Sequence, residues 1–313
     1  MKPIAVWAPA AERVEIDREG PAELFGDVLY FEHAVIARGG RGLPLAAGPS
    51  GWWSRAEPAL AHGEDYAFLV DGEGPFPDPR SPWQPEGVHG PSRRVDHDHF
   101  RWTDGGWQPP PLSSALVYEM HTGTFTGPGT FAAAIGRLDH LVELGVTHLE
   151  LIPVADGPGD RGLGYDGVDL YAPHHAYGGP DGLKQLVDAC HGRGLAVLLD
   201  VVYNHLGPSG NHLGRFRPYF TDLYATPWGE AVNLDGPGSD EVRPFFIDNA
   251  FMWLRDYHID GLRVDAVHAI LDTSAVHFLE QLAAEVEDLS AGLGRHLVLI
   301  AESDLNDPRL VRP

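Results

Sequence analysis

Two residue types that often decide a protein's class are almost missing from this sequence. The 313 residues include a single cysteine, Cys190, so no disulfide can form within the chain, and a disulfide-rich secreted domain is excluded. Lysine occurs only as Lys2 and Lys184, and 45 acidic against 22 basic side chains give a formal net charge of −23. So acidic a chain would repel nucleic acid and anionic membrane surfaces, whereas a neutral substrate is not excluded.

Long apolar segments are absent as well. No window approaches 18 uninterrupted apolar residues, so the sequence predicts no membrane span. The first ten residues slightly resemble a signal peptide, but Pro3, Pro9 and the charged pair Glu12-Arg13 make the apolar stretch too short, and an edge strand is the better interpretation. We therefore expect a cytoplasmic location.

The first hundred residues have the pattern of an antiparallel β domain. Turn pairs such as Asp71-Gly72 separate β-prone runs at Ile4–Trp7, Val28–Ala34, Asp65–Val70 and Trp102–Trp107. This spacing predicts a small β-sandwich over residues 1–108. The proline-rich stretch 108–111 then predicts a stiff linker.

From residue 109 onward, apolar strands alternate with helical patterns. The expected strands are 115–120, 147–154, 195–203, 261–267 and 297–303; the expected helices are 131–144 with Thr130 as its cap, 179–193, 239–258 with Ser239 as its cap, and 273–289. This alternation predicts a parallel sheet buried on both faces, either doubly wound or a barrel. No G-x-G-x-x-G turn follows the first strand, which argues against a dinucleotide-binding fold.

Polar side chains stand at the ends of these strands. They are Asp200, Asn204 and His205 after the third strand, Arg263 and Asp265 in the fourth, and Glu302 and Asp304 after the fifth. In parallel α/β architectures the carboxyl ends of the strands build the active site. The sequence therefore predicts an active site at this end of the sheet.

Three of these strand ends carry motifs. The segments LDVVYNH (199–205), GLRVDAVH (261–268) and IAESD (300–304) resemble, in this order, the first three signature regions of the α-amylase family of glycoside hydrolases. Further segments resemble the maltooligosyltrehalose trehalohydrolases within that family: 85–93, 164–168 with 171–173, 204–211, 226–229 and 302–309. The resemblance covers essentially the whole chain.

The resemblance implies both a fold and an activity. Residues 1–108 would form the immunoglobulin-like, glucan-binding β-sandwich that precedes the barrel in branching and debranching relatives. Residues 109–313 would form an incomplete (β/α)8 TIM barrel of about five units. The activity implied is the release of trehalose from the end of maltooligosyltrehalose, by retaining cleavage of the adjacent α-1,4-glucosidic bond. We expect this α-glucan as the partner, and neither a cofactor nor a metal.

The chemistry assigns roles to two carboxyl groups. One protonates the leaving oxygen, and in a retaining enzyme the other attacks the sugar carbon from ~5 Å away. By the resemblance, Asp265 is the nucleophile and Glu302 the acid/base. Because neighbouring strands are ~4.8 Å apart, adjacent strand ends would bring the two groups to about this separation. The alternative is structural, with Asp265 as a buried hydrogen-bonded acid and Glu302 as a cap for the next loop.

Arg263 is expected to assist Asp265. Residues two apart in a strand share a face, so the guanidinium can hold the carboxylate ionised, whether or not it also forms a structural ion pair. The resemblance also gives His205 a hydrogen bond to the sugar at the cleavage point and Tyr165 a stacking contact with it. Packing in the core is the alternative for both.

Four more residues complete the candidate site. The resemblance implies that Asp200 orients its neighbours, and we expect structural support from Asn204. His268, three residues past Asp265, could reach the leaving-group side or lie in a loop. Asp304 is a further substrate-binding candidate.

Two histidine clusters suggest metal ligation at first sight. They are His97-Asp98-His99 and His174-His175. Neither an H-E-x-x-H pattern nor a Cys/His pairing accompanies them, so we interpret them as surface or loop residues.

A complete barrel needs more strands than the sequence predicts. A (β/α)8 barrel has eight units, and a fourth signature region with a further aspartate is not found here. We therefore expect a C-terminally truncated chain that is inactive alone, with its third acid beyond residue 313. Two other functions stay open: a branching or debranching enzyme acting on α-1,6 linkages, and a non-catalytic α-glucan-binding fragment.

Overall fold

The computed structural model describes residues 3–18, 42–56 and 59–307. The strand predicted over Val28–Ala34 lies outside these residues. Among them, no helix is long and apolar enough to cross a membrane.

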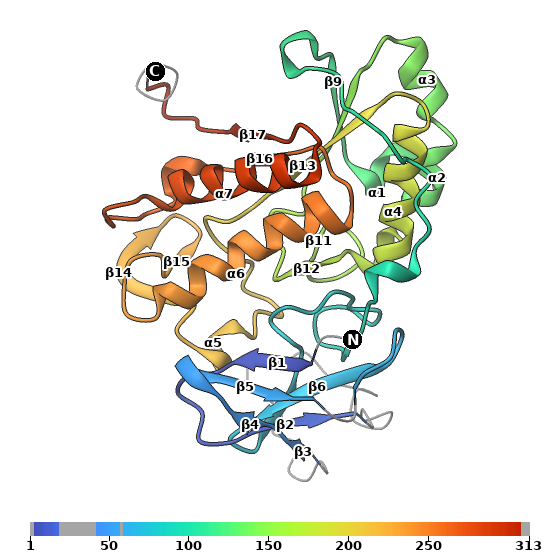
Figure 1. Cartoon of the computed structure of the whole chain (residues 1–313). Helices are drawn as coiled ribbons and strands as arrows, with labels where there is room; N and C mark the ends of the chain where they lie inside the picture. Colours follow the sequence, from blue (N-terminus) through green and yellow to red (C-terminus); the bar gives the residue numbers. More distant parts are fainter. Residues whose placement is uncertain (1–2, 19–41, 57–58, 308–313) are drawn as a thin grey trace.

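Two antiparallel sheets make up the N-terminal part, at the bottom of Figure 1. The first has the order β1 (Ile4–Trp7), β5 (Trp52–Arg55), β4 (Ala46–Ala47). The second has the order β3 (Leu43–Pro44), β2 (Val14–Asp17), β6 (Asp65–Val70), β7 (Glu73–Phe76), with β8 (Ser92–Arg93) also paired to β6. A short 3₁₀ turn at Pro49–Gly51 joins β4 to β5, and two more follow the sheets at His97–His99 and Leu112–Ser114. The strands predicted at Ile4–Trp7 and Asp65–Val70 are therefore confirmed.

The strand predicted over Trp102–Trp107 is wrong. This segment has no strand partner, and its polar groups bind the following part of the chain instead. Thr103 donates through its amide and hydroxyl to Asp188, at 2.8 and 2.7 Å, and the Trp107 indole donates to Asp260 at 2.9 Å. The backbone is held by these side chains rather than by a sheet.

A parallel sheet of five strands forms the second part (Figure 1). Its spatial order equals its chain order: β9 (Val117–Met120), β10 (His148–Leu151), β13 (Ala196–Val201), β16 (Gly261–Val264), β17 (Val298–Ala301). All five predicted strands are present, each shorter than expected. A small antiparallel pair, β11 (Ala155–Asp156) with β12 (Asp169–Pro173), and the hairpin β14 (Phe220–Thr226) with β15 (Gly229–Val232) lie outside this sheet.

The prediction that the sheet is buried on both faces is wrong at its edges. The strands β10, β13 and β16 are almost entirely buried, but Val117, Tyr118 and Glu119 of β9 are exposed and β17 is only half-buried. The cause is position, because in the described residues β9 and β17 each have a neighbouring strand on one side only.

Helices join the strands and pack on the sheet. They are α1 (Thr122–Phe125), α2 (Phe131–Ile135), α3 (Leu138–Glu143), α4 (Gly179–His191), α5 (Leu213–Phe216), α6 (Ser239–Phe251) and α7 (Phe278–Leu293), with 3₁₀ turns at His175–Tyr177 and Val267–Ala269 and a π-helical turn at Met252–Asp256. In Figure 1, α6 and α7 run side by side across the sheet, while α4 covers its other end near α2.

The helices differ from the prediction in several boundaries, three of which have a clear physical cause. The single helix expected over 131–144 is interrupted at Gly136 and Arg137, although Thr130 caps it as expected by accepting from the Ala133 amide at 3.2 Å. Gly238, at φ 87°, is the N-cap of α6 in place of Ser239, because glycine tolerates this left-handed conformation. The last helix begins at Phe278 rather than at residue 273. The Asp272 side chain accepts from the amides of Ser274 and Phe278, which holds the preceding residues in a loop.

The two parts of the chain share one continuous apolar core. The Trp7 ring meets Tyr219 edge-on at 5.4 Å between centroids, and Phe68 meets Phe216 at 6.3 Å. Between the parts, Lys184 on α4 is fully buried, with its Nζ donating to the His97 carbonyl at 3.3 Å and lying 5.6 and 5.4 Å from the Phe100 and Tyr257 rings. Burial lowers the pKa of this amine.

A charged clamp fixes the segment before the linker to the sheet. His191, at the end of α4, lies 2.8 Å from Asp104 through Nδ1 and 3.0 Å from Asp260 through Nε2. With a carboxylate at each ring nitrogen, the protonated form of His191 can donate on both sides. His258 also donates to Asp104 at 2.8 Å, and Trp107 stacks on the His191 ring at 4.5 Å.

The clamp makes stability depend on pH in a defined direction. Burial acts to raise the pKa of Asp104, but the hydrogen bonds from His191 and His258 outweigh it and hold this pKa well below the usual range. Its contribution is therefore present above about pH 4 and lost as the pH falls further. The pKa of His191 is raised by its two carboxylate partners against the effect of burial, so its contribution is complete below about pH 6.5 and lost at higher pH.

We expect Asp104→Asn to lower the free energy of unfolding by about 3 kcal/mol near pH 6, because the substitution removes the partner of a buried histidinium. Urea unfolding at pH 6 and again at pH 3.5 measures the effect, which should shrink at the lower pH. The control is Asp139→Asn, which removes an exposed pair with Arg193 and should cost less than about 1 kcal/mol. Equal losses in the two variants at pH 6 would contradict the role given to the clamp.

Candidate active site

The carboxyl ends of β16 and β17 bring three charged side chains together. Arg263 Nη1 donates to Asp265 Oδ1 at 3.0 Å, and Arg263 Nη2 lies 3.6 Å from Glu302 Oε2. The strands set this arrangement, since Arg263 pairs with Ile300 across the parallel ladder and Glu302 lies two residues further on. One guanidinium therefore contacts both candidate carboxyl groups.

The backbone after Asp265 also faces Glu302. Ala266 has a left-handed conformation at φ 43°, ψ 52°, which is costly for a residue with a Cβ. In this conformation its amide donates to Glu302 Oε2 at 2.8 Å. Asn204 fixes Asp265 itself, with Nδ2 donating to the side chain at 3.1 Å and to the backbone carbonyl at 2.9 Å. A costly backbone conformation is thus retained where the two candidate carboxyl groups are oriented.

Asp200 lies beneath this group and is 1% exposed. Its Oδ2 accepts from Arg263 Nη1 at 2.5 Å and from the Tyr165 hydroxyl at 2.8 Å. Burial raises the pKa of Asp200 to about 6, and these two hydrogen bonds offset part of the rise. Asp200 therefore orients both Arg263 and Tyr165, which brings Tyr165 from a distant loop to the strand ends.

His205 has protein partners at both ring nitrogens. Nε2 contacts the Tyr165 carbonyl at 3.0 Å, and Nδ1 contacts the Asn204 side-chain oxygen. A hydrogen bond from His205 to a sugar would require exchange of one of these partners.

His268 and Asp304 lie together at the margin of the site. His268 Nε2 is 3.3 Å from Asp304 Oδ1, and His268 Nδ1 is 3.3 Å from the Ser303 hydroxyl. The Asp304 side chain is 82% exposed, so it is open to a ligand. The structure thus brings all nine candidate residues to the ends of β13, β16 and β17 and the loop that carries Tyr165.

Comparison with known proteins gives a consistent picture. The family model described as "Alpha amylase, catalytic domain" matches residues 97–217. Curated proteins named malto-oligosyltrehalose trehalohydrolase from Arthrobacter ramosus and Rhizobium sp. are 53% and 49% identical to this chain over 98% of its length. The chain is a relative of the malto-oligosyltrehalose trehalohydrolases. It spans about half their length, 51% and 50% of these two proteins.

Other relatives are more distant from the chain than these trehalohydrolases. A protein named 1,4-alpha-glucan branching enzyme GlgB from Pseudoalteromonas atlantica is 32% identical over 85% of the chain and is covered over 38% of its own length. A crystal structure from Salmonella typhimurium named as an alpha amylase superposes with a TM-score of 0.86 at 40% identity, covering 97% of this chain and 48% of the other. The fold is therefore that of the TIM-barrel-type glycoside hydrolases.

One aromatic contact at the candidate site is absent from the residues predicted from the sequence. The Trp228 ring, in the turn between β14 and β15, stacks on His205 with 5.0 Å between centroids and 18° between planes. Trp228 is 47% exposed. Its segment, residues 226–229, contributes to the resemblance, but nothing in the sequence places it against His205, which lies 23 positions earlier.

The prediction that His174 and His175 are surface or loop residues holds in its second form. His174 lies in the loop between β12 and the 3₁₀ turn His175–Tyr177, although it is only 5% exposed. Ligand atoms of Asp156, His174 and His175 lie within 4.8 Å of one another, which is spacing that a metal could use. Protein groups already engage these atoms: His175 Nδ1 donates to Asp156 at 2.9 Å, and His174 Nδ1 accepts from the Ala176 amide at 3.2 Å. The buried Asp156 is therefore compensated by hydrogen bonding.

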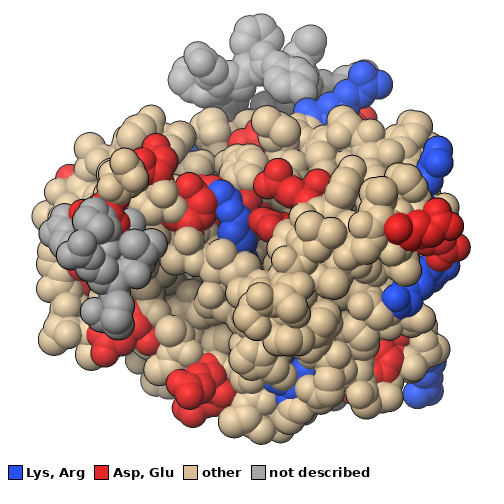
Figure 2. All heavy atoms as spheres, turned by 90° about the horizontal axis from the view of Figure 1, so that it is seen from above, with Lys and Arg blue, Asp and Glu red and all other residues tan. Residues whose placement is uncertain are grey.

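Charge on the upper face suits a neutral ligand better than an anionic one. Figure 2 shows acidic side chains spread over this face, and near its centre a basic side chain stands beside acidic ones. The net charge of −23 has the same sign as a phosphate group.

Proposed function

We propose that the protein is a retaining glycoside hydrolase that releases trehalose from the end of maltooligosyltrehalose. The observation that carries the proposal is the contact of Arg263 with both Asp265 and Glu302 at adjacent strand ends. The relatives named malto-oligosyltrehalose trehalohydrolase support this substrate in particular.

Each carboxyl group would act twice. Glu302 would be first an acid and then a base, and Asp265 first the nucleophile and then the leaving group. Glu302 gives its proton to the glycosidic oxygen while Asp265 attacks the sugar carbon, so that the carbon–oxygen bond breaks and trehalose leaves. The maltooligosyl unit is then an ester on Asp265. Glu302 takes a proton from water, which attacks the same carbon and releases Asp265. The configuration at that carbon is retained because it is inverted twice.

The surrounding residues would prepare this reaction. Arg263 would direct the Asp265 carboxylate, with Asp200 fixing the guanidinium from the other side. Tyr165, His205, His268 and Asp304 would line the sugar site, and Asn204 would keep Asp265 in place. No cofactor takes part in these steps.

We also propose a domain assignment. Residues 1–108 would be a glucan-binding type of β-sandwich formed by the two N-terminal sheets. Residues 109–313 would contribute five of the eight strand–helix units of a TIM barrel, which agrees with five parallel strands in consecutive order. A cytoplasmic location fits the chain's single cysteine.

Product analysis tests the activity. The full-length protein as the cell makes it is incubated with maltooligosyltrehalose, and the expected products are free trehalose and a shortened maltooligosaccharide. Cleavage or formation of α-1,6 linkages without trehalose would favour a branching or debranching enzyme. Binding of α-glucan without any product would favour a non-catalytic glucan-binding protein.

A bell-shaped dependence of kcat/KM on pH is expected for this activity. The reaction needs Asp265 ionised and Glu302 protonated at the same time, so the rate falls at low pH as Asp265 gains a proton and at high pH as Glu302 loses one. Rates measured from pH 3 to pH 10 check this. A rate that rises steadily to pH 10 would show that a different base does the work.

A further inference from the structure

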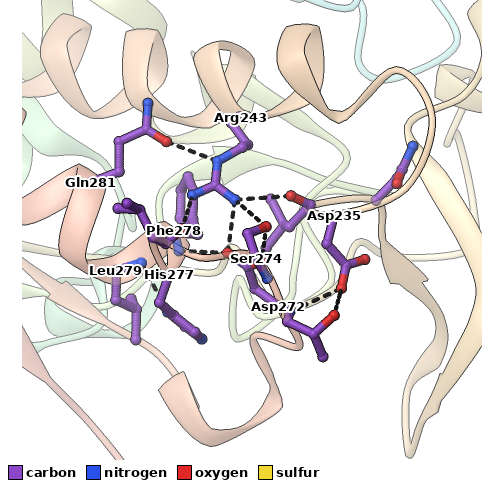
Figure 3. A network of polar contacts seen from close by, with 12 residues as sticks. Asp235, Arg243, Asp272, Ser274, His277, Phe278, Leu279 and Gln281 are labelled. Atoms are coloured by element: carbon purple, nitrogen blue, oxygen red, sulfur yellow. Dashed lines mark hydrogen bonds and ion pairs between the residues drawn. The ribbon is translucent and has the colours of Figure 1, made fainter.

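A network of polar contacts joins α6 to the loop that follows Asp265 (Figure 3). Its centre is Arg243, which is on α6 and is 9% exposed. The guanidinium donates to the Leu234 carbonyl at 2.9 Å, the Val276 carbonyl at 2.7 Å and the Gln281 side chain at 2.8 Å. Arg243 therefore binds segments that lie before α6, in the loop after β16 and in α7.

The same loop supplies a charged partner. Arg243 Nη1 donates to Asp272 Oδ2 at 2.8 Å, and the Asp272 side chain is fully buried. Asp272 also accepts from the amides of Ser274 at 2.8 Å and Phe278 at 2.6 Å, as Figure 3 shows. Since both charged groups are buried and fully bonded, loss of either one would leave the other uncompensated.

Asp235 extends this network to the β14–β15 hairpin. Its Oδ2 accepts from the Thr273 amide at 2.9 Å, from the Thr273 hydroxyl at 2.7 Å and from the Tyr224 hydroxyl at 2.5 Å. Tyr224 belongs to β14, and the turn of the same hairpin carries Trp228, which stacks on His205. A chain of contacts therefore runs from Arg243 to the aromatic side of the candidate site.

The hairpin depends on such contacts for its position. Its two strands pair with each other and, among the described residues, with no other strand. Of the seven residues of β14, four are half-buried and three are exposed. An isolated two-stranded hairpin is marginally stable in water. Side-chain contacts must therefore fix where it stands relative to Asp265.

We propose that Arg243 and Asp235 are positioning residues that hold the β14–β15 hairpin against the loop following Asp265. They keep Trp228 over His205 and so set one wall of the sugar site. The inference rests on the proposed function, because the wall matters only if a sugar binds there. Neither residue touches the reacting atoms.

The first test removes a single hydroxyl from the full-length protein. Tyr224→Phe is expected to raise KM for maltooligosyltrehalose about 3- to 10-fold with kcat nearly unchanged, which corresponds to one hydrogen bond to a charged group. Tyr66→Phe is the matched control, because it removes a hydroxyl that donates to Asp78 at 2.7 Å in the N-terminal sheets. The control should lower the melting temperature without altering KM.

The second test separates position from stability. Arg243→Gln is expected to lower kcat about 10- to 100-fold as the loop after Asp265 shifts, since a displacement of ~1 Å can cost ~100-fold. Arg243→Lys keeps the charge and should recover part of the loss. If Tyr224→Phe and Asp235→Asn are folded and have the KM and kcat of the unchanged protein, the inference is wrong.

A readout that needs no substrate distinguishes this inference from the proposed function. Hydrogen exchange of the peptides spanning 220–232 and 270–276 should accelerate in Tyr224→Phe and Arg243→Gln, and not in Tyr66→Phe. Unchanged exchange in both peptides would overturn the positioning role even if the enzyme is active. An unmodified protein that releases no trehalose would instead overturn the proposed function.

Discussion

Asp265→Asn is expected to lower trehalose release by the full-length protein by about 10⁴-fold or more. The substitution keeps the shape of the side chain but removes the negative charge that attacks the sugar carbon, and loss of a nucleophile is among the largest single effects known in enzymes. The amide oxygen can still accept from Arg263, and Asn204 keeps its bond to the backbone carbonyl of residue 265, so substrate binding should be largely preserved. Single-turnover rates and equilibrium binding of maltooligosyltrehalose measure the two effects separately.

Glu302→Gln should cost about 10²- to 10⁴-fold, the usual contribution of a general acid/base. Its effect should be smaller for substrates with good leaving groups, which need no proton. The control for both variants is Asp139→Asn, in which the same chemical change falls on an exposed ion pair with Arg193. Near-normal rates in Asp265→Asn or in Glu302→Gln would refute the assigned roles.

Residues 1–313 expressed alone are expected to release no measurable trehalose. Five parallel strands cannot close a barrel that needs eight, and in the described residues β9 and β17 keep one unpaired edge each. The proposed nucleophile and acid/base are then present, but part of the wall that would hold the sugar in an attack geometry is not. Because a misplacement of ~1 Å already costs ~100-fold, the combined loss should exceed this by far.

The experiment compares this polypeptide with the Arthrobacter ramosus relative in the same trehalose assay. Folded but inactive protein agrees with the expectation. Comparable activity per mole would contradict it, and the oligomeric state should then be measured, because a second copy could complete the barrel.

The parts of the fold that follow repeating patterns were predictable from the sequence. Continuous apolar runs alternating with helical patterns predicted the five parallel strands, and the motif around Arg263 and Asp265 placed a charged group at the end of the fourth. Arg263 and Asp265 lie two residues apart in sequence, so strand geometry alone brings them together.

The features that depend on contacts between distant segments were not predictable. The predicted start of the last helix at residue 273 is wrong because Asp272 holds residues 273–277 in a loop. It does so through hydrogen bonds to the amides of Ser274 and Phe278, which local helix propensity does not reveal. The segment Trp102–Trp107 was predicted as a strand from its aromatic residues, whereas Asp104 and Trp107 are fixed by His191 and Asp260. The prediction that β9 is buried on both faces is wrong because the hydrophobic pattern of a strand does not show whether it lies at the edge or in the centre of the sheet.

Because Lys184 is buried, the chemical reactivity of its amine reports local opening between α4 and the segment before the linker. The chain has one other lysine, Lys2, so an acylating reagent meets few competing sites. The amine is fully buried against the Phe100 and Tyr257 rings, so a reagent reaches it only when this region opens. The rate of acylation at Lys184 should thus follow the separation of α4 from the segment before the linker, in protein that carries no engineered label.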